Sequence, residues 1–83
     1  MKVRVLYFAR LRERFGVGEE QLDFAGTTAA DLVAQLQLRG GVWAEELGPG
    51  RAFRVAVNQE IVALDARLPD NAEVAVFPPV TGG

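Results

Sequence analysis

The spacing of apolar and polar positions predicts that the two end segments of the chain are strands buried on both faces. Residues 3–9 read Val-Arg-Val-Leu-Tyr-Phe-Ala, and residues 73–77 read Glu-Val-Ala-Val-Phe. β-Branched and aromatic residues favour strands, and a strand covered on both faces loses the alternation of apolar with polar positions. We therefore expect these two segments to lie side by side in the middle of a sheet.

Further strands are predicted between these two. Residues 19–24 place Leu22 and Phe24 on one face, which is typical of a strand with one buried face. Residues 51–57 alternate the large apolar side chains Phe53, Val55 and Val57 with Ala52, Arg54 and Ala56, and indicate another strand. Asn58-Gln59 predicts a two-residue turn into a return strand over residues 61–63. A second turn, Leu68-Pro69-Asp70-Asn71, precedes the last strand. The sequence thus predicts a sheet of about five strands.

One principal helix is predicted between the second and third strands. Thr28 is followed three residues later by Asp31, which resembles a capping box, and the pair Gly40-Gly41 ends the helix. Three apolar residues follow the start at helical spacing: Leu32, Val33 and Leu36. Shorter helical turns are predicted where apolar residues stand four apart, at Leu11 with Phe15 and at Trp43 with Leu47. The order β-β-α-β-β-β indicates an α+β fold with a helix packed on a sheet.

Composition is that of one small domain. With 83 residues, of which 49% are hydrophobic, the chain can close a single core, and it has no cysteine with which to form disulfides. The apolar run over residues 5–9 is far too short for a secretory segment or a membrane span. We therefore expect a cytoplasmic protein that does not contact membranes.

Charge and residue types exclude several functions. A net charge of −2 argues against nucleic-acid binding, and the basic cluster Arg10, Arg12 and Arg14 is expected to be a solvated face, although one of them could pair with an acidic partner residue. Without histidine or cysteine the chain has no imidazole base, thiolate nucleophile or soft metal ligand, and it has no glycine-rich phosphate-binding motif. We expect no bound cofactor and no autonomous catalysis. Any role in chemistry is then that of a substrate or carrier.

The last ten residues, Val-Ala-Val-Phe-Pro-Pro-Val-Thr-Gly-Gly, carry the strongest functional signal. Pro78 and Pro79 end the strand and favour an extended backbone, so we expect a domain over residues 1–77 and a tail over 78–83 that can reach roughly 20 Å. The pair Gly82-Gly83 presents a carboxylate on a narrow stalk whose acyl carbon no side chain obstructs. This is the form a chain takes when its own C-terminus is the reactive group.

Several segments resemble the ubiquitin-like β-grasp sulfur carriers, and among them the small subunits of molybdopterin synthase. They are Val5-Leu6-Tyr7-Phe8-Ala9 with Arg12-Glu13, Val57-Asn58-Gln59, Leu68-Pro69-Asp70 and Glu73 to Gly83. The resemblance spans the chain, and its last eleven residues are the specific part. Val76 departs from the family, in which a second aromatic residue often precedes the proline pair.

This resemblance implies a β-grasp fold, a mixed sheet on one main helix, and a chemical role for the C-terminus. An adenylyltransferase related to ubiquitin-activating enzymes would use ATP to adenylate Gly83, with Gly82 allowing the chain to enter narrow sites. A persulfide donor would then convert the carboxylate to a thiocarboxylate. The synthase large subunit, in a heterotetramer, would pass this sulfur to cyclic pyranopterin monophosphate.

The same resemblance and the predicted strand ends indicate a partner-binding surface around the tail. Phe8, Ile61 and Phe77 are expected to form an apolar patch with Arg12 at its rim, and the tail residues Pro78, Pro79, Val80 and Thr81 are expected to enter the partner. The alternative is that the three apolar side chains belong to the core.

Other functions share these features. A sulfur carrier for thiamine synthesis or tRNA thiolation would have the same fold and Gly-Gly end, although Phe77 to Thr81 favours the molybdopterin branch. A ubiquitin-like protein modifier is a second class, and the single lysine, Lys2, argues against branched chains of this protein on itself. A plain interaction domain with an inert tail is the third.

Overall fold

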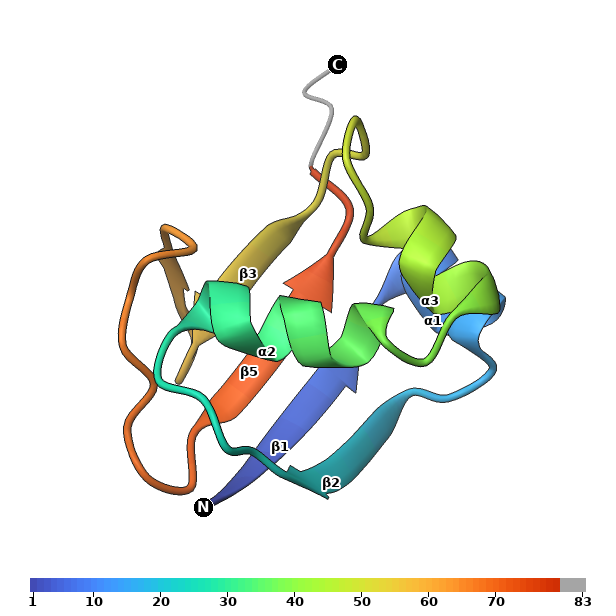
Figure 1. Cartoon of the computed structure of the whole chain (residues 1–83). Helices are drawn as coiled ribbons and strands as arrows, with labels where there is room; N and C mark the ends of the chain where they lie inside the picture. The colour runs from blue at the N-terminus through green and yellow to red at the C-terminus, as the bar shows by residue number, and fades with distance from the viewer. Residues whose placement is uncertain (80–83) are drawn as a thin grey trace.

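The computed structural model describes residues 1–79, which form a five-stranded sheet with three helices. In chain order the elements are β1 (Lys2–Tyr7), α1 (Ala9–Phe15), β2 (Glu19–Asp23), α2 (Ala29–Gln37), α3 (Gly41–Glu46), β3 (Arg54–Val57), β4 (Glu60–Val62) and β5 (Glu73–Phe77). The sheet order is β2-β1-β5-β3-β4 (Figure 1). The predicted α+β fold is confirmed, and the two shorter helical turns are α1 and α3.

The two end segments of the chain form the centre of the sheet, as predicted. β1 and β5 are parallel neighbours, with Val5 opposite Val74 and Tyr7 opposite Val76. β5 also pairs with β3, and β1 with β2, both antiparallel. The last strand is therefore hydrogen-bonded on both sides at the point where it leads into the tail (Figure 1).

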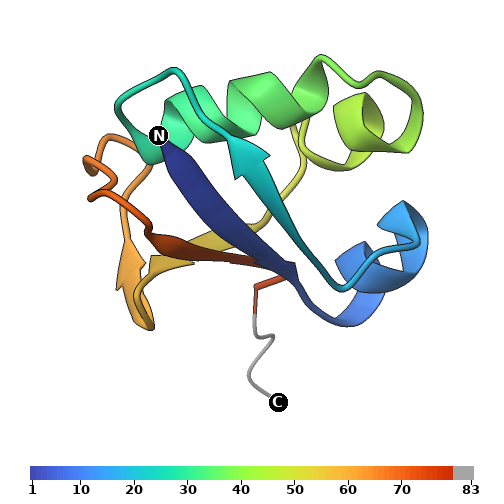
Figure 2. The ribbon, with the colours of Figure 1, turned by 90° about the horizontal axis from the view of Figure 1, so that it is seen from below.

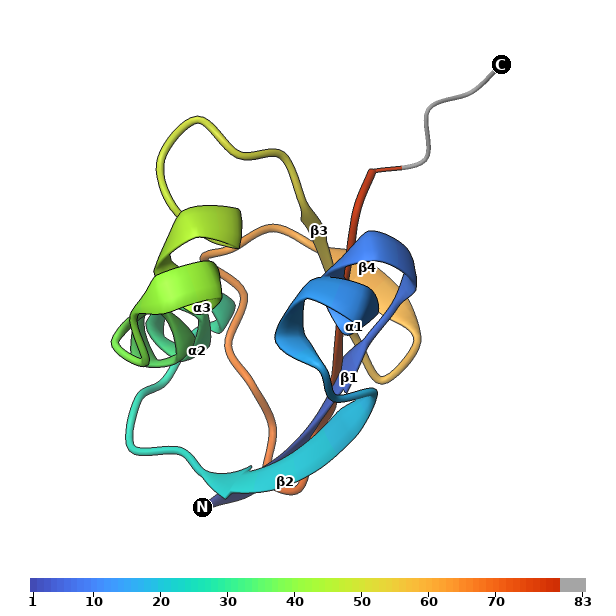
Figure 3. The same ribbon diagram turned by 90° about the vertical axis from the view of Figure 1, so that its right-hand side faces the viewer.

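The helices α2 and α3 cover one face of the sheet, which Figure 3 shows edge-on. Val3, Val5 and Tyr7 of β1 point into the core between the layers, together with Val74 and Val76 of β5. No helix of residues 1–79 lies on the sheet's other face, as the view from below shows (Figure 2). Helix α2 begins with the predicted capping box: the Thr28 hydroxyl accepts from the Asp31 backbone N–H, and the Asp31 carboxylate accepts from the Thr28 backbone N–H.

Turn residues set where the elements begin and end. Helix α1 ends at Gly16, whose φ of 74° places it in the left-handed region. Asn58 and Gln59 have φ values of 49° and 72°, so the predicted two-residue turn between β3 and β4 is confirmed.

Strand β3 begins at Arg54, three residues later than the pattern predicts. Arg54 pairs with Phe77, and the next residue of the partner strand, Pro78, has no backbone N–H with which to extend the ladder. The prediction of a strand from residue 51 was therefore wrong, because the alternating pattern continues past the end of its partner.

None of the helices in residues 1–79 is long and apolar enough to cross a membrane.

Candidate partner-binding face

The uncovered face of the sheet carries a row of apolar side chains across four strands. In the strand registers Leu6 lies opposite Ala75, Ala75 opposite Ala56, and Ala56 opposite Ile61. These residues alternate with the core residues of the same strands, so they point away from the helices. Ile61, at the edge of this row, is 66% exposed.

Two aromatic residues extend this row toward the tail. Phe77 is the last residue of β5 and is half-buried, while Phe8 follows β1 and is 46% exposed. Tyr7 pairs with Val76, so continuing the parallel register by one residue places Phe8 beside Phe77. We call the six residues Leu6, Phe8, Ala56, Ile61, Ala75 and Phe77 the sheet patch. It runs across the uncovered face from Ile61, at the β4 edge, to Phe77, the last strand residue before the tail.

The structure places the three apolar residues that the sequence nominated on one face of the sheet, with Phe8 beside Phe77 and Ile61 two strands away on β4. Phe8 and Ile61 are exposed and Phe77 is half-buried, so the alternative that all three belong to the core is wrong. Sequence reasoning missed Leu6, Ala56 and Ala75. The signal for them was available, because each is the apolar residue between two core positions of a central strand, but alternation alone does not say which face the helices cover.

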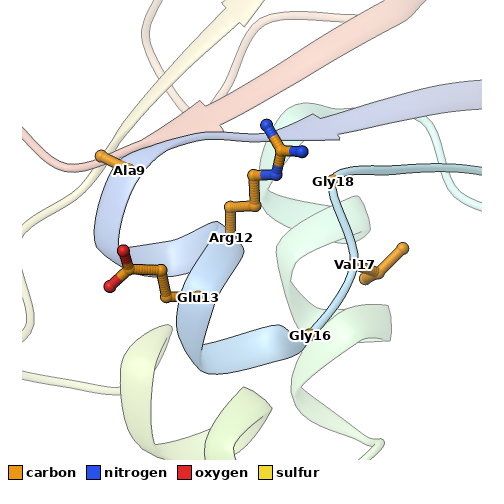
Figure 4. Close-up of a pocket in the computed structure, with 6 residues that line it drawn as sticks. All are labelled: Ala9, Arg12, Glu13, Gly16, Val17 and Gly18. Atoms are coloured by element: carbon orange, nitrogen blue, oxygen red, sulfur yellow. The ribbon is translucent and has the colours of Figure 1, made fainter.

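Arg12 lies beside the sheet patch with its side chain across Gly18 (Figure 4). A Cβ atom placed at Gly18 would come within 3.0 Å of Nε of Arg12, so a residue larger than glycine would displace the side chain. Arg12 separates two shallow hollows: Leu6, Tyr7 and Phe8 line one, and Glu13, Gly16 and Val17 line the other. Within residues 1–79 its guanidinium makes no ion pair. Arg12 thus lies beside Leu6 and Phe8 of the sheet patch, and its role in partner binding stays a prediction.

The root of the tail rests against a neighbouring loop. Pro78 and Pro79 are half-buried, and together with Arg10 and the segment 50–52 they line a hollow of about 380 Å³. The remaining nominated tail residues, Val80, Thr81, Gly82 and Gly83, lie outside the described residues.

The other arginines of the basic cluster tie α1 to α3. Glu46, 4% exposed, accepts hydrogen bonds from Arg10 Nη2 at 3.1 Å and from Arg14 Nε at 2.9 Å. A buried carboxylate requires such partners, because desolvation penalises the charge. The expectation of a solvated basic face is therefore only partly right: all three arginines are exposed, but Arg10 and Arg14 also hold two helices together.

A second polar cluster lies behind β1. The Tyr7 hydroxyl donates to Glu20 at 2.7 Å, and Arg39 donates to the two oxygens of the same carboxylate at 2.8 and 2.7 Å. The hydrogen bonds from Arg39 hold the pKa of Glu20 below its usual value, while burial, together with the bond to Glu20, raises the pKa of Tyr7. Tyr7 also contacts the stacked rings of Phe15 and Trp43. Trp43 is thus a core anchor, and this cluster stabilises the end of β1 from which Phe8 projects.

Comparison with known proteins agrees with this geometry. The model of the ThiS family matches residues 5–83. The molybdopterin synthase sulfur carrier subunit of Haemophilus influenzae is 40% identical over 81 residues, which cover 98% of this chain and 99% of the relative. Family membership therefore rests on the whole chain, the last four residues included.

Solved structures share the fold. A Pyrococcus furiosus protein described as a candidate molybdopterin converting factor subunit 1 has a TM-score of 0.81 at 36% identity, covering 96% of this chain and 99% of that one. SAMP1 of Haloferax volcanii has a TM-score of 0.78 at 28% identity over the full length of both chains. Subunit 1 of the Helicobacter pylori molybdopterin-converting factor, solved in complex with subunit 2, has a TM-score of 0.70 at 27% identity over both full lengths. With its ubiquitin-like β-grasp fold, the chain belongs to the ThiS family and is similar from end to end to sulfur carrier subunits of molybdopterin synthase.

Proposed function

We propose that this protein is the sulfur carrier of a molybdopterin synthase, with the carboxyl group of Gly83 as the group that carries sulfur. One observation carries the proposal: an apolar patch on the uncovered face of the sheet, with Phe8 and Ile61 exposed, reaches the residue from which a tail ending in Gly-Gly leaves. The similarity to sulfur carrier subunits supports the same reaction class. The absence of cysteine leaves the C-terminus as the position at which this chain can hold sulfur.

The chemistry begins with activation, because a carboxylate is a poor electrophile. An activating enzyme of the adenylyltransferase class transfers AMP from ATP to the Gly83 carboxylate and releases pyrophosphate. The terminal sulfur of a persulfide on the donor attacks the acyl carbon, and AMP leaves. A second thiol then reduces the acyl disulfide, which releases the thiocarboxylate and leaves the donor sulfur in a disulfide with that thiol. Because the carrier binds no nucleotide in this scheme, ATP belongs to the activating enzyme.

The thiocarboxylate is then a nucleophile for the synthase reaction. Like a thiolate, it is anionic near neutral pH. In this proposal the large subunit binds the sheet patch and the tail in a heterotetramer of two copies of each chain. The thiocarboxylate sulfur bonds to a carbon of cyclic pyranopterin monophosphate and displaces an oxygen substituent from it. One water then hydrolyses the resulting thioester, so that the sulfur stays on the pterin and Gly83 returns to the carboxylate. Before this reaction, burial of the tail in the large subunit keeps bulk water away from the thiocarboxylate and so protects it from hydrolysis.

Reconstitution tests this function. Carrier purified from its native host is first weighed intact, and we expect a fraction whose mass corresponds to one sulfur in place of one oxygen. That thiocarboxylated carrier, mixed with the large subunit and cyclic pyranopterin monophosphate, should yield molybdopterin. The control is the unmodified carrier, which should yield none.

Two other outcomes would assign a different function. No molybdopterin, together with sulfur delivery in a thiazole-forming or tRNA-thiolation assay, would place the protein in a neighbouring branch of sulfur carriers. The likeness to the archaeal protein SAMP1, described among related structures as a small archaeal modifier protein, favours one further candidate function, protein modification. Isopeptide-linked conjugates ending in Gly83, found in the native host by mass spectrometry, would support that function instead.

A further inference from the structure

Two arginines lie next to the tail root. Arg10, near the start of α1, and Arg51, in the loop between α3 and β3, line the hollow whose apolar wall is Pro78 and Pro79. Gly50, with a φ of 83°, turns this loop just before Arg51. We call Arg10 and Arg51 the arginine collar.

The collar is held in place by carboxylates but keeps free donors. Arg10 gives one hydrogen bond, from Nη2 to the buried Glu46. Arg51 Nη2 lies 3.5 Å from Glu45, which is an ion pair without a hydrogen bond between them. A guanidinium has five N–H donors, so among the partners offered by residues 1–79 most donors of both side chains remain unused. The side chains are 54% and 40% exposed, so a partner can reach them.

The local charge favours an anion. The collar belongs to a network of three arginines, with Arg14 as the third, and two glutamates, Glu45 and Glu46. This network has one excess positive charge, although the whole chain has a net charge of −2. Planar guanidinium groups recognise carboxylates in bidentate geometry, and such charge-assisted hydrogen bonds are strong.

We propose that the arginine collar receives a carboxylate side chain of the large subunit that binds the tail; this inference rests on the proposed function. The phosphate of the adenylate formed on Gly83 is the other anion that the collar could bind in the proposed function. It is bonded to Gly83 in the adenylate, four residues beyond Pro79, and an extended chain of that length reaches roughly 13 Å. An acidic residue of the large subunit at the tail root would face the collar directly, whereas a phosphate on Gly83 is four residues farther along the chain. The ion pair sets the orientation in which the tail enters.

The test measures binding of the large subunit to carrier variants. Arg51→Ala should weaken binding about tenfold and reduce its dependence on salt, because it removes a charge-assisted contact. Arg51→Lys should recover part of the affinity, since it keeps the charge but not the planar fork. The matched control is Arg67→Ala, which removes the same charge from an exposed site in the segment between β4 and β5, away from the tail root. We expect Arg67→Ala to bind within about twofold of the wild type.

Each alternative result has a distinct meaning. Equal binding of Arg51→Ala and wild type, or equal losses for Arg51→Ala and Arg67→Ala, overturns the collar while the proposed function stands. Failure of the wild-type carrier to bind the large subunit overturns both. AMP is added to the carrier alone as a phosphate probe. If AMP shifts the amide resonances of Gly50 and Ala52 in the wild type but not in Arg51→Ala, then the collar binds a phosphate. That result would overturn the proposal that its ligand is a carboxylate. Arg51 makes no hydrogen bond to Glu45, so we expect Arg51→Ala to unfold within about 2 °C of the wild type.

Discussion

Replacing Ile61 by alanine should separate partner binding from folding. Ile61 is 66% exposed, so only about a third of its side chain is buried in the free protein. Truncation of a fully buried isoleucine costs about 2–5 kcal/mol of unfolding free energy, and a third of that is about 1 kcal/mol. The partner would cover the rest of the side chain, and truncation of an interface anchor costs about 2 kcal/mol or more, roughly a 30-fold loss of affinity.

The control is another exposed apolar side chain on the opposite layer. Leu38 ends α2 and is 86% exposed, on the side of the molecule that carries the helices. Leu38→Ala should change the unfolding free energy by less than about 1 kcal/mol and leave partner binding unchanged.

The assay pairs denaturant unfolding with titration of the large subunit for wild type and both variants. We expect Ile61→Ala to lose more binding than folding free energy, and Leu38→Ala to lose little of either. If Ile61→Ala loses folding free energy and keeps its affinity, then the uncovered face of the sheet is not the binding face. If Leu38→Ala weakens binding as much as Ile61→Ala does, the partner contacts the helical layer.

Phe77→Ala should likewise weaken partner binding, by about 2–4 kcal/mol. Its cost in unfolding free energy should be smaller, roughly 1–2 kcal/mol, because the ring is half-buried at the edge of the sheet patch. The reverse ranking in paired unfolding and binding measurements would place Phe77 in the core. Deleting Gly83 should abolish sulfur acceptance, followed by intact mass, and leave Tm nearly unchanged, whereas a large drop in Tm would show that the tail is structural. The pKa of Glu20 in the folded protein is lowered, so its carboxylate stabilises the fold at pH values above its ordinary pKa of 4.5. This contribution to stability is lost as the pH falls through the lowered pKa. Glu20→Gln should therefore be least stable relative to wild type at pH 7, with the gap closing in acid; a gap that stays constant with pH would contradict this.

The fold could be predicted because local signals agreed with one another. The capping box at Thr28, the turn at Asn58-Gln59 and the two apolar end strands each matched the structure. The start of β3 could not be predicted, because it depends on where the partner strand stops. No pattern within residues 51–53 shows that Pro78 lies opposite them.

The apolar part of the candidate site was predicted better than its polar part. Aromatic residues at strand ends indicate a surface even when the face is unknown. The pairing of Arg10 and Arg14 with Glu46 is different, because it joins residues more than thirty positions apart. Spacing along one helix shows that two arginines share a face, but only the packing of α1 on α3 shows which carboxylate meets them.

The position of β5 has a mechanical consequence. Its ladders to β1 and β3 run along the direction in which the chain leaves the sheet. A pull on the tail therefore loads the hydrogen bonds on both sides together, in shear, whereas a pull across an edge strand would break them one after another. A partner that draws the tail into a groove thus works against a stiff anchor. In the proposed function, the domain therefore stays folded each time a partner pulls the tail in and releases it.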